Sequence, residues 1–183
     1  MKYSAFALPL IAVLAACSSP SETNASDISA ATESAETAAV DAGIGGAPSG
    51  PVYTKNAGET LALSGYDAVS YFAGDAPVEG SAAHTVRYQG YDYQFASAEN
   101  ASKFTADPAK FAPQYGGYCA WAIGANDALA PGDPQVYKIV DGKLYLNFND
   151  AVSKKWADDI PGFIAKGDVN YPTHDASEHY TTN

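Results

Sequence analysis

The sequence predicts a small single α+β domain, built from two β-hairpin-plus-helix units packed on a common aromatic-rich core. One observation is that the aromatic residues, 12% of the 183-residue chain, concentrate between Tyr53 and Tyr171. The other is that an alternating apolar pattern around a glycine turn, followed by a short helical pattern, occurs twice in this region. Residues 53–172 are enough for one globular domain with its own core.

The first predicted unit begins with a hairpin. Residues 84–95 alternate apolar and polar side chains around Gln89-Gly90, which is typical of two strands joined by a tight turn. Ser97 then stands at the N-cap position of a short amphipathic helix that runs to Phe104. Asp107-Pro108 predicts the end of that helix and a new turn starting at the proline.

The second predicted unit repeats this order. Residues 137–148 alternate around Asp141-Gly142, a strong hairpin signal. Asn149 is the expected N-cap of a helix that runs to Trp156, and Ile160-Pro161 predicts a further helical turn.

A shift of 52 residues superposes the two units. It places Gly90 on Gly142, Tyr93 on Tyr145, Lys103 on Lys155, Phe104 on Trp156, Asp107 on Asp159 and Phe111 on Phe163. Common ancestry of the units and convergence on a frequent motif are both open. The matched aromatic residues are expected to pack strands against helices rather than to stack on a ligand.

The N-terminus predicts a processed secretory segment. Lys2 precedes an apolar run from Phe6 to Leu14, too short to span a bilayer, and small residues follow it. The sequence Leu14-Ala15-Ala16-Cys17 resembles a bacterial lipobox. That resemblance implies a signal peptide at residues 1–16, lipidation of Cys17 and a cell-envelope protein that faces the periplasm. The alternative is an ordinary secreted protein with an incidental cysteine. Ser18 in place of aspartate favours the outer membrane.

Composition predicts extended segments on both sides of the domain. Residues 17–52 are rich in Ser, Ala, Thr, Glu, Gly and Pro, so we expect a disordered tether behind the lipidated cysteine. Residues 173–183 form a polar C-terminal tail that we also expect to be disordered. The formal net charge of −11 argues against nucleic-acid binding. The partners that the lipobox resemblance leads us to expect are the membrane, through the N-terminal lipid, and an envelope protein.

Cys119 is the central candidate for chemistry. If Cys17 carries lipid, Cys119 is the only thiol of the mature chain, which excludes an intramolecular disulfide. One interpretation is a partly exposed redox thiol with a lowered pKa, near the start of a short helix. Its candidate pocket consists of Gly116, Gly117, Tyr118 and Trp121. The other interpretation is a buried, inert residue.

Metal ligands are few. His84 begins the first predicted strand, and His174 and His179 lie in the polar tail with acidic residues between them. Two histidines at this spacing hold Cu(II) or Zn(II) weakly, so copper or another soft metal is a candidate cofactor. The alternative is that all three are incidental surface histidines.

The segment Tyr88-Gln89-Gly90 to Phe95-Ala96-Ser97, followed by Asp107-Pro108, resembles the YHS domain. That family has a tyrosine, a glycine turn, an aromatic strand, Phe-x-Ser, a short helix and Asp-Pro. Residues 113–120 and 140–147 are similar to a longer bacterial subgroup of YHS domain-containing (seleno)proteins. The resemblance covers about residues 61–172.

The resemblance carries limited functional information. YHS domains occur beside heavy-metal transporters and are proposed to bind metal through cysteines. Ser70, Ala96 and Asn100 occupy the matching positions here, and none is a soft ligand. The subgroup implies that some relatives carry selenocysteine where others have cysteine, and Cys119 is the one residue that fits that position.

These observations predict a lipid-anchored YHS-domain protein of the cell envelope that handles redox chemistry or a soft metal through Cys119. The alternative is a non-catalytic module that binds a partner protein or a small ligand, with Cys119 in a structural role. No Ser-His-Asp arrangement or phosphate-binding loop is visible in the sequence, so a binding protein is expected ahead of an enzyme.

Overall fold

A computed structural model describes residues 40–44, 50–74 and 76–180, with side chains from residue 50 onward. All of them belong to one compact domain, Glu36–Asn183, which contains both hairpin-plus-helix units. The predicted signal peptide, Cys17 and residues 17–39 of the predicted tether lie outside the described residues. None of the described helices is both long enough and apolar enough to cross a membrane.

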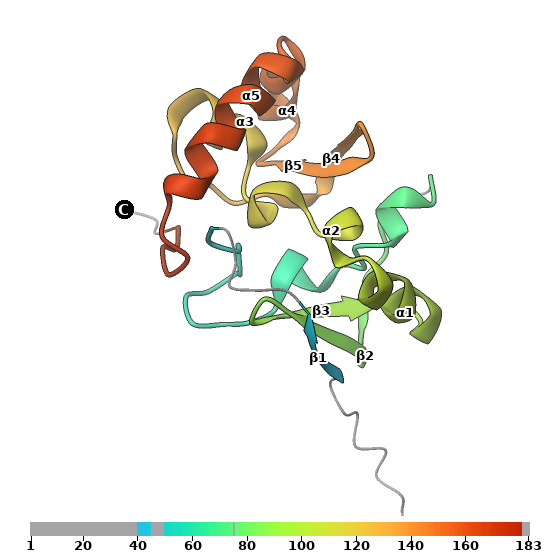
Figure 1. Ribbon diagram of the computed structural model, residues 1–183. Coiled ribbons are helices and arrows are strands. Elements are labelled where there is room, and N and C mark those ends of the chain that lie inside the picture. The colour runs from blue at the N-terminus through green and yellow to red at the C-terminus, as the bar shows by residue number, and fades with distance from the viewer. Residues whose placement is uncertain (1–39, 45–49, 75, 181–183) are drawn as a thin grey trace, which may run out of the picture. The chain divides into compact units, whose positions relative to one another are not determined.

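The fold is α+β, as the sequence predicts (Figure 1). The strands are β1 (Val40–Ile44), β2 (Ser81–Tyr88), β3 (Tyr91–Phe95), β4 (Asp133–Val140) and β5 (Lys143–Asn147). The α-helices are α1 (Ala98–Ala106), α2 (Pro108–Phe111), α3 (Ala120–Asn126), α4 (Asp150–Ala157) and α5 (Ile160–Asn170). Short 3-10 turns are η1 (Ala62–Gly65), η2 (Ser70–Phe72), η3 (Gln114–Gly117) and η4 (Tyr171–Thr173).

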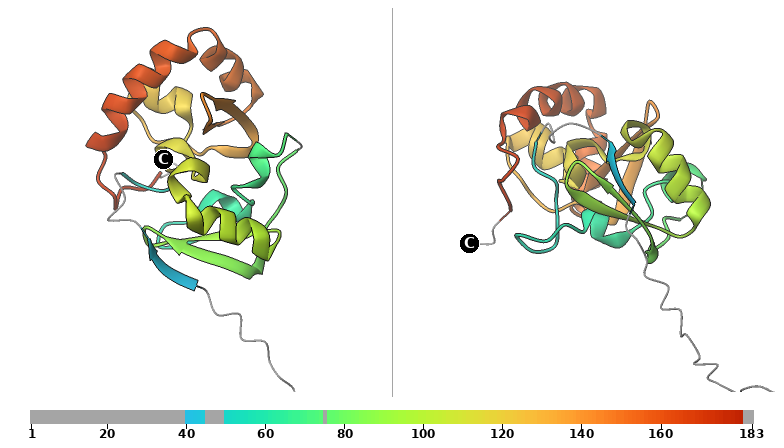
Figure 2. Two further views of the ribbon diagram at one scale, coloured as in Figure 1. Left: turned by 45° about the vertical axis from the view of Figure 1, so that its right-hand side comes forward. Right: turned by 60° about the horizontal axis from the view of Figure 1, so that its bottom comes forward.

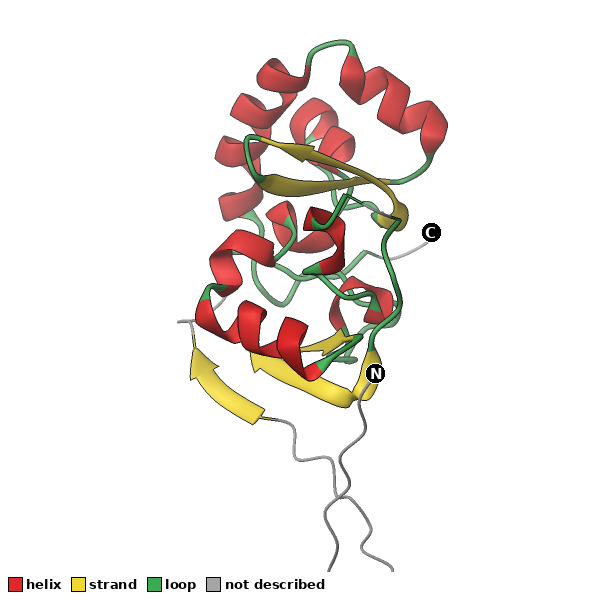
Figure 3. Ribbon diagram, turned by 90° about the vertical axis from the view of Figure 1, so that its right-hand side faces the viewer, coloured by secondary structure: helices red, strands yellow, loops and turns green. Residues whose placement is uncertain are grey.

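The strands form two separate small sheets, which Figure 3 shows in yellow. One sheet has the order β1-β2-β3 and carries α1 on its hairpin, and the other is the β4-β5 hairpin with α3, α4 and α5 near it (Figure 2). Both predicted hairpins are confirmed. Their first strands begin earlier than the alternating pattern indicated, because a β-bulge interrupts each of them.

The two hairpins share one register at a shift of 52 residues. Val86 pairs with Tyr93 in the first hairpin, and Lys138 pairs with Tyr145 in the second. The bulges also match, since they fall between Ser81 and Thr85 and between Asp133 and Tyr137.

The helix starts match in the same way. The side chain of Ser97 accepts a hydrogen bond from the amide of Asn100, and Asn149 accepts one from Val152, so both predicted N-caps are confirmed. Asp107 and Asp159 cap the helices that begin at Pro108 and Ile160. Each cap satisfies an amide that the first helical turn leaves without a partner.

The equivalence extends to an unusual turn before each hairpin. Leu63, Ser64 and Gly65 all have positive φ, at 54°, 52° and 82°. Their counterparts at the 52-residue shift, the segment Tyr115-Gly116-Gly117, have φ of 53°, 59° and 84°. Ser64 has a φ close to that of Gly116, so the positive φ alone does not require glycine at position 116. Glycine is needed at position 116 for a different reason, because a β-carbon there would collide with the carbonyl oxygen of Pro51. Shared irregularities of this kind favour duplication over convergence.

The core consists of two clusters that meet at β5. Leu144 and Leu146 belong to the cluster that includes Tyr93 and Phe104, and Tyr145 points into the cluster that includes Trp156. Successive strand residues point to opposite faces, so β5 is buried on both sides. The predicted common core is therefore two aromatic clusters that share one strand.

The matched aromatic side chains of the second strands and of the helices that follow them are buried, as predicted. The rings of Tyr93 and Phe104 stack with centroids 4.8 Å apart, and those of Tyr145 and Trp156 lie 5.5 Å apart. In each unit the pair joins the second strand of the hairpin to the helix that follows it. Such pairs add to the stabilisation that comes from apolar burial alone.

The predicted domain boundaries are too narrow at both ends. Val52 is buried, the hydroxyl of Tyr171 donates to the Pro51 carbonyl at 2.8 Å, and β1 pairs with β2 in parallel. The part of the predicted tether from residue 50 to 52 therefore belongs to the core. The tail up to residue 180 is also packed, because His179 contacts Thr54.

Candidate functional site

Cys119 lies at the N-cap of α3, between η3 and the helix, and is fully buried. Burial raises the pKa of its thiol. The backbone N–H groups of Ala122, Phe148 and Trp121 lie near the sulfur and lower the pKa by less than burial raises it. The prediction of a partly exposed thiol with a lowered pKa is therefore wrong, because desolvation outweighs the surrounding amides.

Among the residues that the structure describes, the sulfur has one side-chain hydrogen-bond partner. Cys119 Sγ lies 3.7 Å from Asn147 Oδ1, which also accepts a hydrogen bond from the amide of Trp121 at 3.2 Å. Asn147 is itself fully buried. Its Nδ2 has no hydrogen-bond partner among the described residues. A buried N–H donor without a hydrogen-bond partner lowers the stability of the fold, so Asn147 is an unusual feature of the core.

The four predicted pocket residues do not form a pocket around the thiol. Tyr118 is fully buried and meets Tyr53 edge to face at 5.5 Å. Trp121 is half-buried, and its ring lies 5.2 Å from the Lys155 ammonium. Gly116 faces Pro51, and the carbonyl of Gly117 lies against Gly132. These residues surround the turn that leads to Cys119 and pack it against other segments.

Asp67 is a fully buried carboxylate in the first unit that none of the sequence patterns above singled out. Its Oδ1 accepts hydrogen bonds from the amides of Val69 and Ser70 at 2.8 and 3.3 Å. Its Oδ2 accepts from the amide of Ala96 at 2.9 Å and from Asn100 Nδ2 at 2.7 Å. A carboxylate surrounded by four N–H donors is well satisfied without a metal or a cation.

Asp67 brings together the three positions that the family resemblance associates with metal. Ser70 lies 26 residues before Ala96 and 30 before Asn100 in the sequence, yet each of the three donates to the Asp67 carboxylate. The sequence signal was present: Gly65-Tyr66-Asp67 stands 52 residues before Gly117-Tyr118-Cys119. The structure thus places a hydrogen-bonded carboxylate at the point where these three positions meet.

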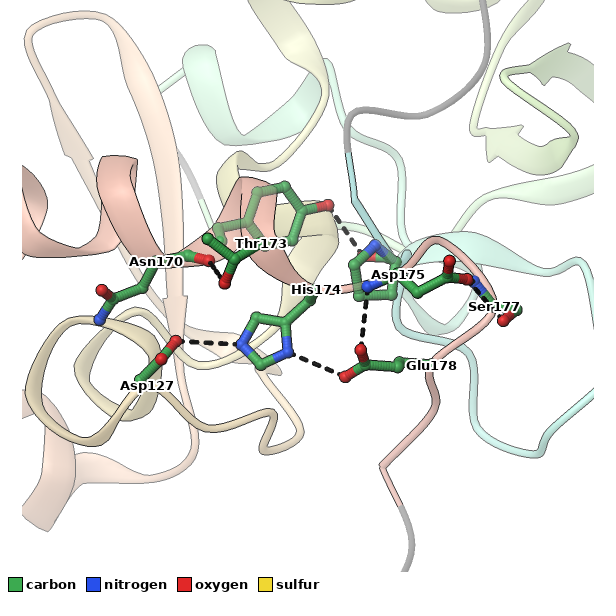
Figure 4. A network of polar contacts seen from close by, with 9 residues as sticks. Asp127, Asn170, Thr173, His174, Asp175, Ser177 and Glu178 are labelled. Atoms are coloured by element: carbon green, nitrogen blue, oxygen red, sulfur yellow. Dashed lines mark hydrogen bonds and ion pairs between the residues drawn. The ribbon is translucent and has the colours of Figure 1, made fainter.

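The tail histidines hold the C-terminal segment on the folded unit, and Figure 4 shows the contacts of His174. His174 Nδ1 lies 2.9 Å from Glu178 Oε2, and its Nε2 lies 3.2 Å from Asp127 Oδ1. His179 contacts the Tyr180 carbonyl through Nδ1 and the Thr54 carbonyl through Nε2, at 2.8 and 2.9 Å. The predicted disorder of residues 173–180 is wrong, because these contacts fix the segment.

The three histidines do not meet in one site. His84 lies in β2 and lines a cavity of about 480 Å³ together with small residues of β2 and α1. Among the residues that the structure describes, no group of three His, Cys, Asp or Glu side chains is placed to hold a metal ion. The weak metal-binding predictions for His84, His174 and His179 remain predictions.

An open cleft of about 630 Å³ lies between segments of the two units. It is lined by Tyr53, Lys55, Glu59, Leu61, Ser64, Pro131, Gly132, Asp133, Pro134 and Phe148. Phe148 is 48% exposed, the kind of apolar surface that binding sites use. The lining thus offers aromatic and apolar surface together with two carboxylates and one ammonium group.

Another cavity, of about 400 Å³, lies around η3, α2 and the end of α5. Tyr115 and Asp168 both line it, and the Tyr115 hydroxyl donates to Asp168 Oδ1 at 2.9 Å. Burial, followed by the contact with Asp168, raises the pKa of Tyr115 well above its usual range. The hydroxyl therefore stays protonated and serves as a hydrogen-bond donor.

Comparison of the chain with protein-family models, curated proteins and solved structures finds no match. The resemblance to the YHS domain therefore rests on the motifs quoted above.

Proposed function

We propose that this chain is a lipid-anchored binding module of the bacterial cell envelope, with Cys119 in a structural role in the reduced protein. The observation that supports this interpretation over a redox or soft-metal function is the complete burial of Cys119, together with the raised pKa of its thiol. A reactive thiol needs access and thiolate character, and both are low here. The interaction site of the module is the 630 Å³ cleft.

The chemistry of the cleft favours a small amphipathic ligand with an aromatic part and a basic group. Phe148 and Tyr53 offer aromatic surface, and Glu59 and Asp133 outnumber Lys55 among the charged lining residues. The formal charge of −11 on the chain also attracts cations over anions. An aromatic amine satisfies both requirements, whereas an aromatic carboxylate satisfies only one.

Calorimetric titration with tryptamine and with indole-3-acetate tests the cleft. Tryptamine should bind the parent chain more tightly than indole-3-acetate does, and the Phe148→Ala variant should lose most of this binding. Val169→Ala is a matched control, because Val169 is an exposed apolar residue on α5 outside the cleft. Equal binding of tryptamine to both variants, or no binding to the parent, would contradict the proposal.

The lipid anchor is tested separately through Cys17. The Cys17→Ser variant should lack the diacylglyceryl group and should leave the detergent phase for the aqueous phase in a Triton X-114 partition, because each buried lipid methylene contributes about 0.8 kcal/mol to membrane attachment. Metabolic labelling with a radioactive fatty acid gives an independent readout. A serine variant that still partitions with detergent and still incorporates label rules out lipidation at Cys17.

A further inference from the structure

The duplicated architecture places Cys119 on the position of Asp67. The positive-φ turns before them match, and the next β-bridges match as well, since Tyr66 pairs with Glu79 and Tyr118 pairs with Pro131. Asp67 and Cys119 directly follow these two tyrosines. The two side chains therefore leave equivalent points of the backbone and enter equivalent parts of the core.

The backbone donors around the two side chains are also equivalent. Asp67 accepts from the amides of Val69, Ser70 and Ala96. The amides that lie near Cys119 Sγ are those of Trp121, Ala122 and Phe148, each 52 residues after its counterpart. We call these three amides, together with the buried Asn147 Nδ2, the second cradle. In the first unit, the same arrangement holds an anion with two oxygen atoms.

The second cradle contains more donors than a thiol can satisfy. Asn147 Oδ1 takes the hydrogen bond of the Trp121 amide, and Asn147 Nδ2 is a buried donor without a partner among the described residues. In the first unit a side-chain amide, Asn100 Nδ2, is the fourth donor to the carboxylate. A sulfur atom is a weak acceptor, so these N–H groups are poorly matched to the reduced cysteine.

We propose that Cys119 is an oxidation site whose sulfinate is held by the second cradle as the Asp67 carboxylate is held in the first unit. A sulfinate has two oxygen atoms on the atom bonded to Cβ and a negative charge shared between them, as the carboxylate of aspartate does. Its oxygens accept from the cradle amides, and Asn147 Nδ2 donates after a rotation of its carboxamide. This occupancy satisfies the donor that the reduced state leaves without a partner.

The oxidant is a peroxide. Two hydrogen peroxide molecules react in succession with the thiol, so that two S–O bonds form and the S–H and two O–O bonds break. The sulfur loses four electrons, the peroxides are reduced to two water molecules, and the sulfinic acid releases its proton to solvent. The 630 Å³ cleft offers the approach, because Phe148 and Pro131 line it and are the chain neighbours of the residues around the thiol. Burial makes the reaction slow, and the cradle stabilises its product.

Substitutions at position 119 test whether the second cradle accepts an anion. Asp and Asn have the same shape, but only the Asp carboxylate offers acceptors to every cradle amide. At pH 7 the full-length Cys119→Asp variant should therefore have a higher Tm than Cys119→Asn. In an ordinary apolar core site the order is reversed, because a buried charge costs more than a buried amide. A lower Tm for Cys119→Asp overturns the proposal.

Peroxide exposure of the folded full-length chain tests the modification itself. Tandem mass spectrometry of the Cys119 peptide should show a gain of about 32 Da, for two oxygen atoms on the sulfur. The fragment spectra must assign the oxygens to Cys119 rather than to Trp121, and Cys119→Ala supplies the control for oxidation of the indole. The oxidised chain should keep its Tm or gain stability. A thiol that oxidises only after unfolding, or an oxidised chain that unfolds, overturns the proposal.

Asn147 gives a second, independent readout. Oxidation should raise the Tm less, or lower it more, in the Asn147→Leu variant than in the parent, because leucine offers no donor to the sulfinate. Comparing each variant with its own reduced form removes the cost of the substitution to the fold. If oxidation changes the Tm equally in both chains, the Asn147 carboxamide does not help to hold the sulfinate, which contradicts the proposed cradle.

Discussion

The thiol of Cys119 is fully buried. Alkylation of the native chain by iodoacetamide should therefore be about a hundredfold or more slower than in urea, and its rate should follow unfolding. Because burial raises the pKa of the thiol, any rise of the rate with pH should continue through pH 9 without levelling off. Iodoacetamide is also much larger than peroxide, so the two reagents report different degrees of access. Rapid labelling of the folded chain with a midpoint near pH 7 would mean that the sulfur is exposed.

The side chain of Asp67 joins three segments of the first unit, through Val69, Ala96 and Asn100. Replacing it by Asn turns one acceptor into a donor that faces the amide of Ala96 or the side chain of Asn100. The Asp67→Asn variant should lose about 2 to 4 kcal/mol of unfolding free energy, measured by urea denaturation. Asp158→Asn is the control, because Asp158 is exposed. If both variants lose the same small amount, the buried carboxylate is not stabilising.

At the scale of single elements, the paired N-caps are the clearest test of the duplication. Ser97→Ala and Asn149→Ala each remove the acceptor for one amide in the first helical turn, and each should cost about 1 kcal/mol. The double variant should lose about the sum, because the caps belong to different helices. Ser102→Ala, on the exposed face of α1, should be close to neutral. Urea denaturation measures all four variants, and a cap variant as stable as Ser102→Ala would contradict the assignment.

Sequence patterns predicted these elements because their causes are local. The glycine turns, the caps at Ser97 and Asn149, and the alternation of apolar residues depend on neighbouring residues only. The buried aromatic pairs Tyr93 with Phe104 and Tyr145 with Trp156 follow from the same patterns.

The candidate site was predicted less well because its causes are not local. The exposure of Cys119 depends on β5 and on the segment near Ala130, whose carbonyl accepts from the Cys119 amide. Convergence of Ser70, Ala96 and Asn100 on Asp67 also arises from contacts between distant segments. The polar composition of residues 173–180 indicated disorder, but composition cannot predict an individual hydrogen bond such as that between His179 and Thr54.

For the molecule as a whole, the buried tyrosines predict a loss of stability in alkali. Burial raises the pKa of Tyr118 and of Tyr145 to about 12, from a usual value of 10.0. A raised folded-state pKa favours folding below pH 10, where the hydroxyl is neutral in both states, and this contribution is lost as the pH rises towards 12. Ultraviolet absorbance should show tyrosine ionisation that coincides with loss of circular dichroism. Ionisation of all tyrosines near pH 10 in a chain that stays folded would contradict this.

The position of β5 between the two aromatic clusters has a consequence for how the chain unfolds. Leu144 and Leu146 complete one cluster while Tyr145 completes the other, so the opening of either cluster exposes one face of the same strand. The two repeats therefore form a single cooperative unit and not two independent foldons. In native-state hydrogen exchange, the amides of β5 should exchange only through global unfolding, and exchange in both hairpins should converge on one denaturant-dependent free energy. A fragment that ends before β4 lacks the leucine side chains that close its core and should remain unfolded.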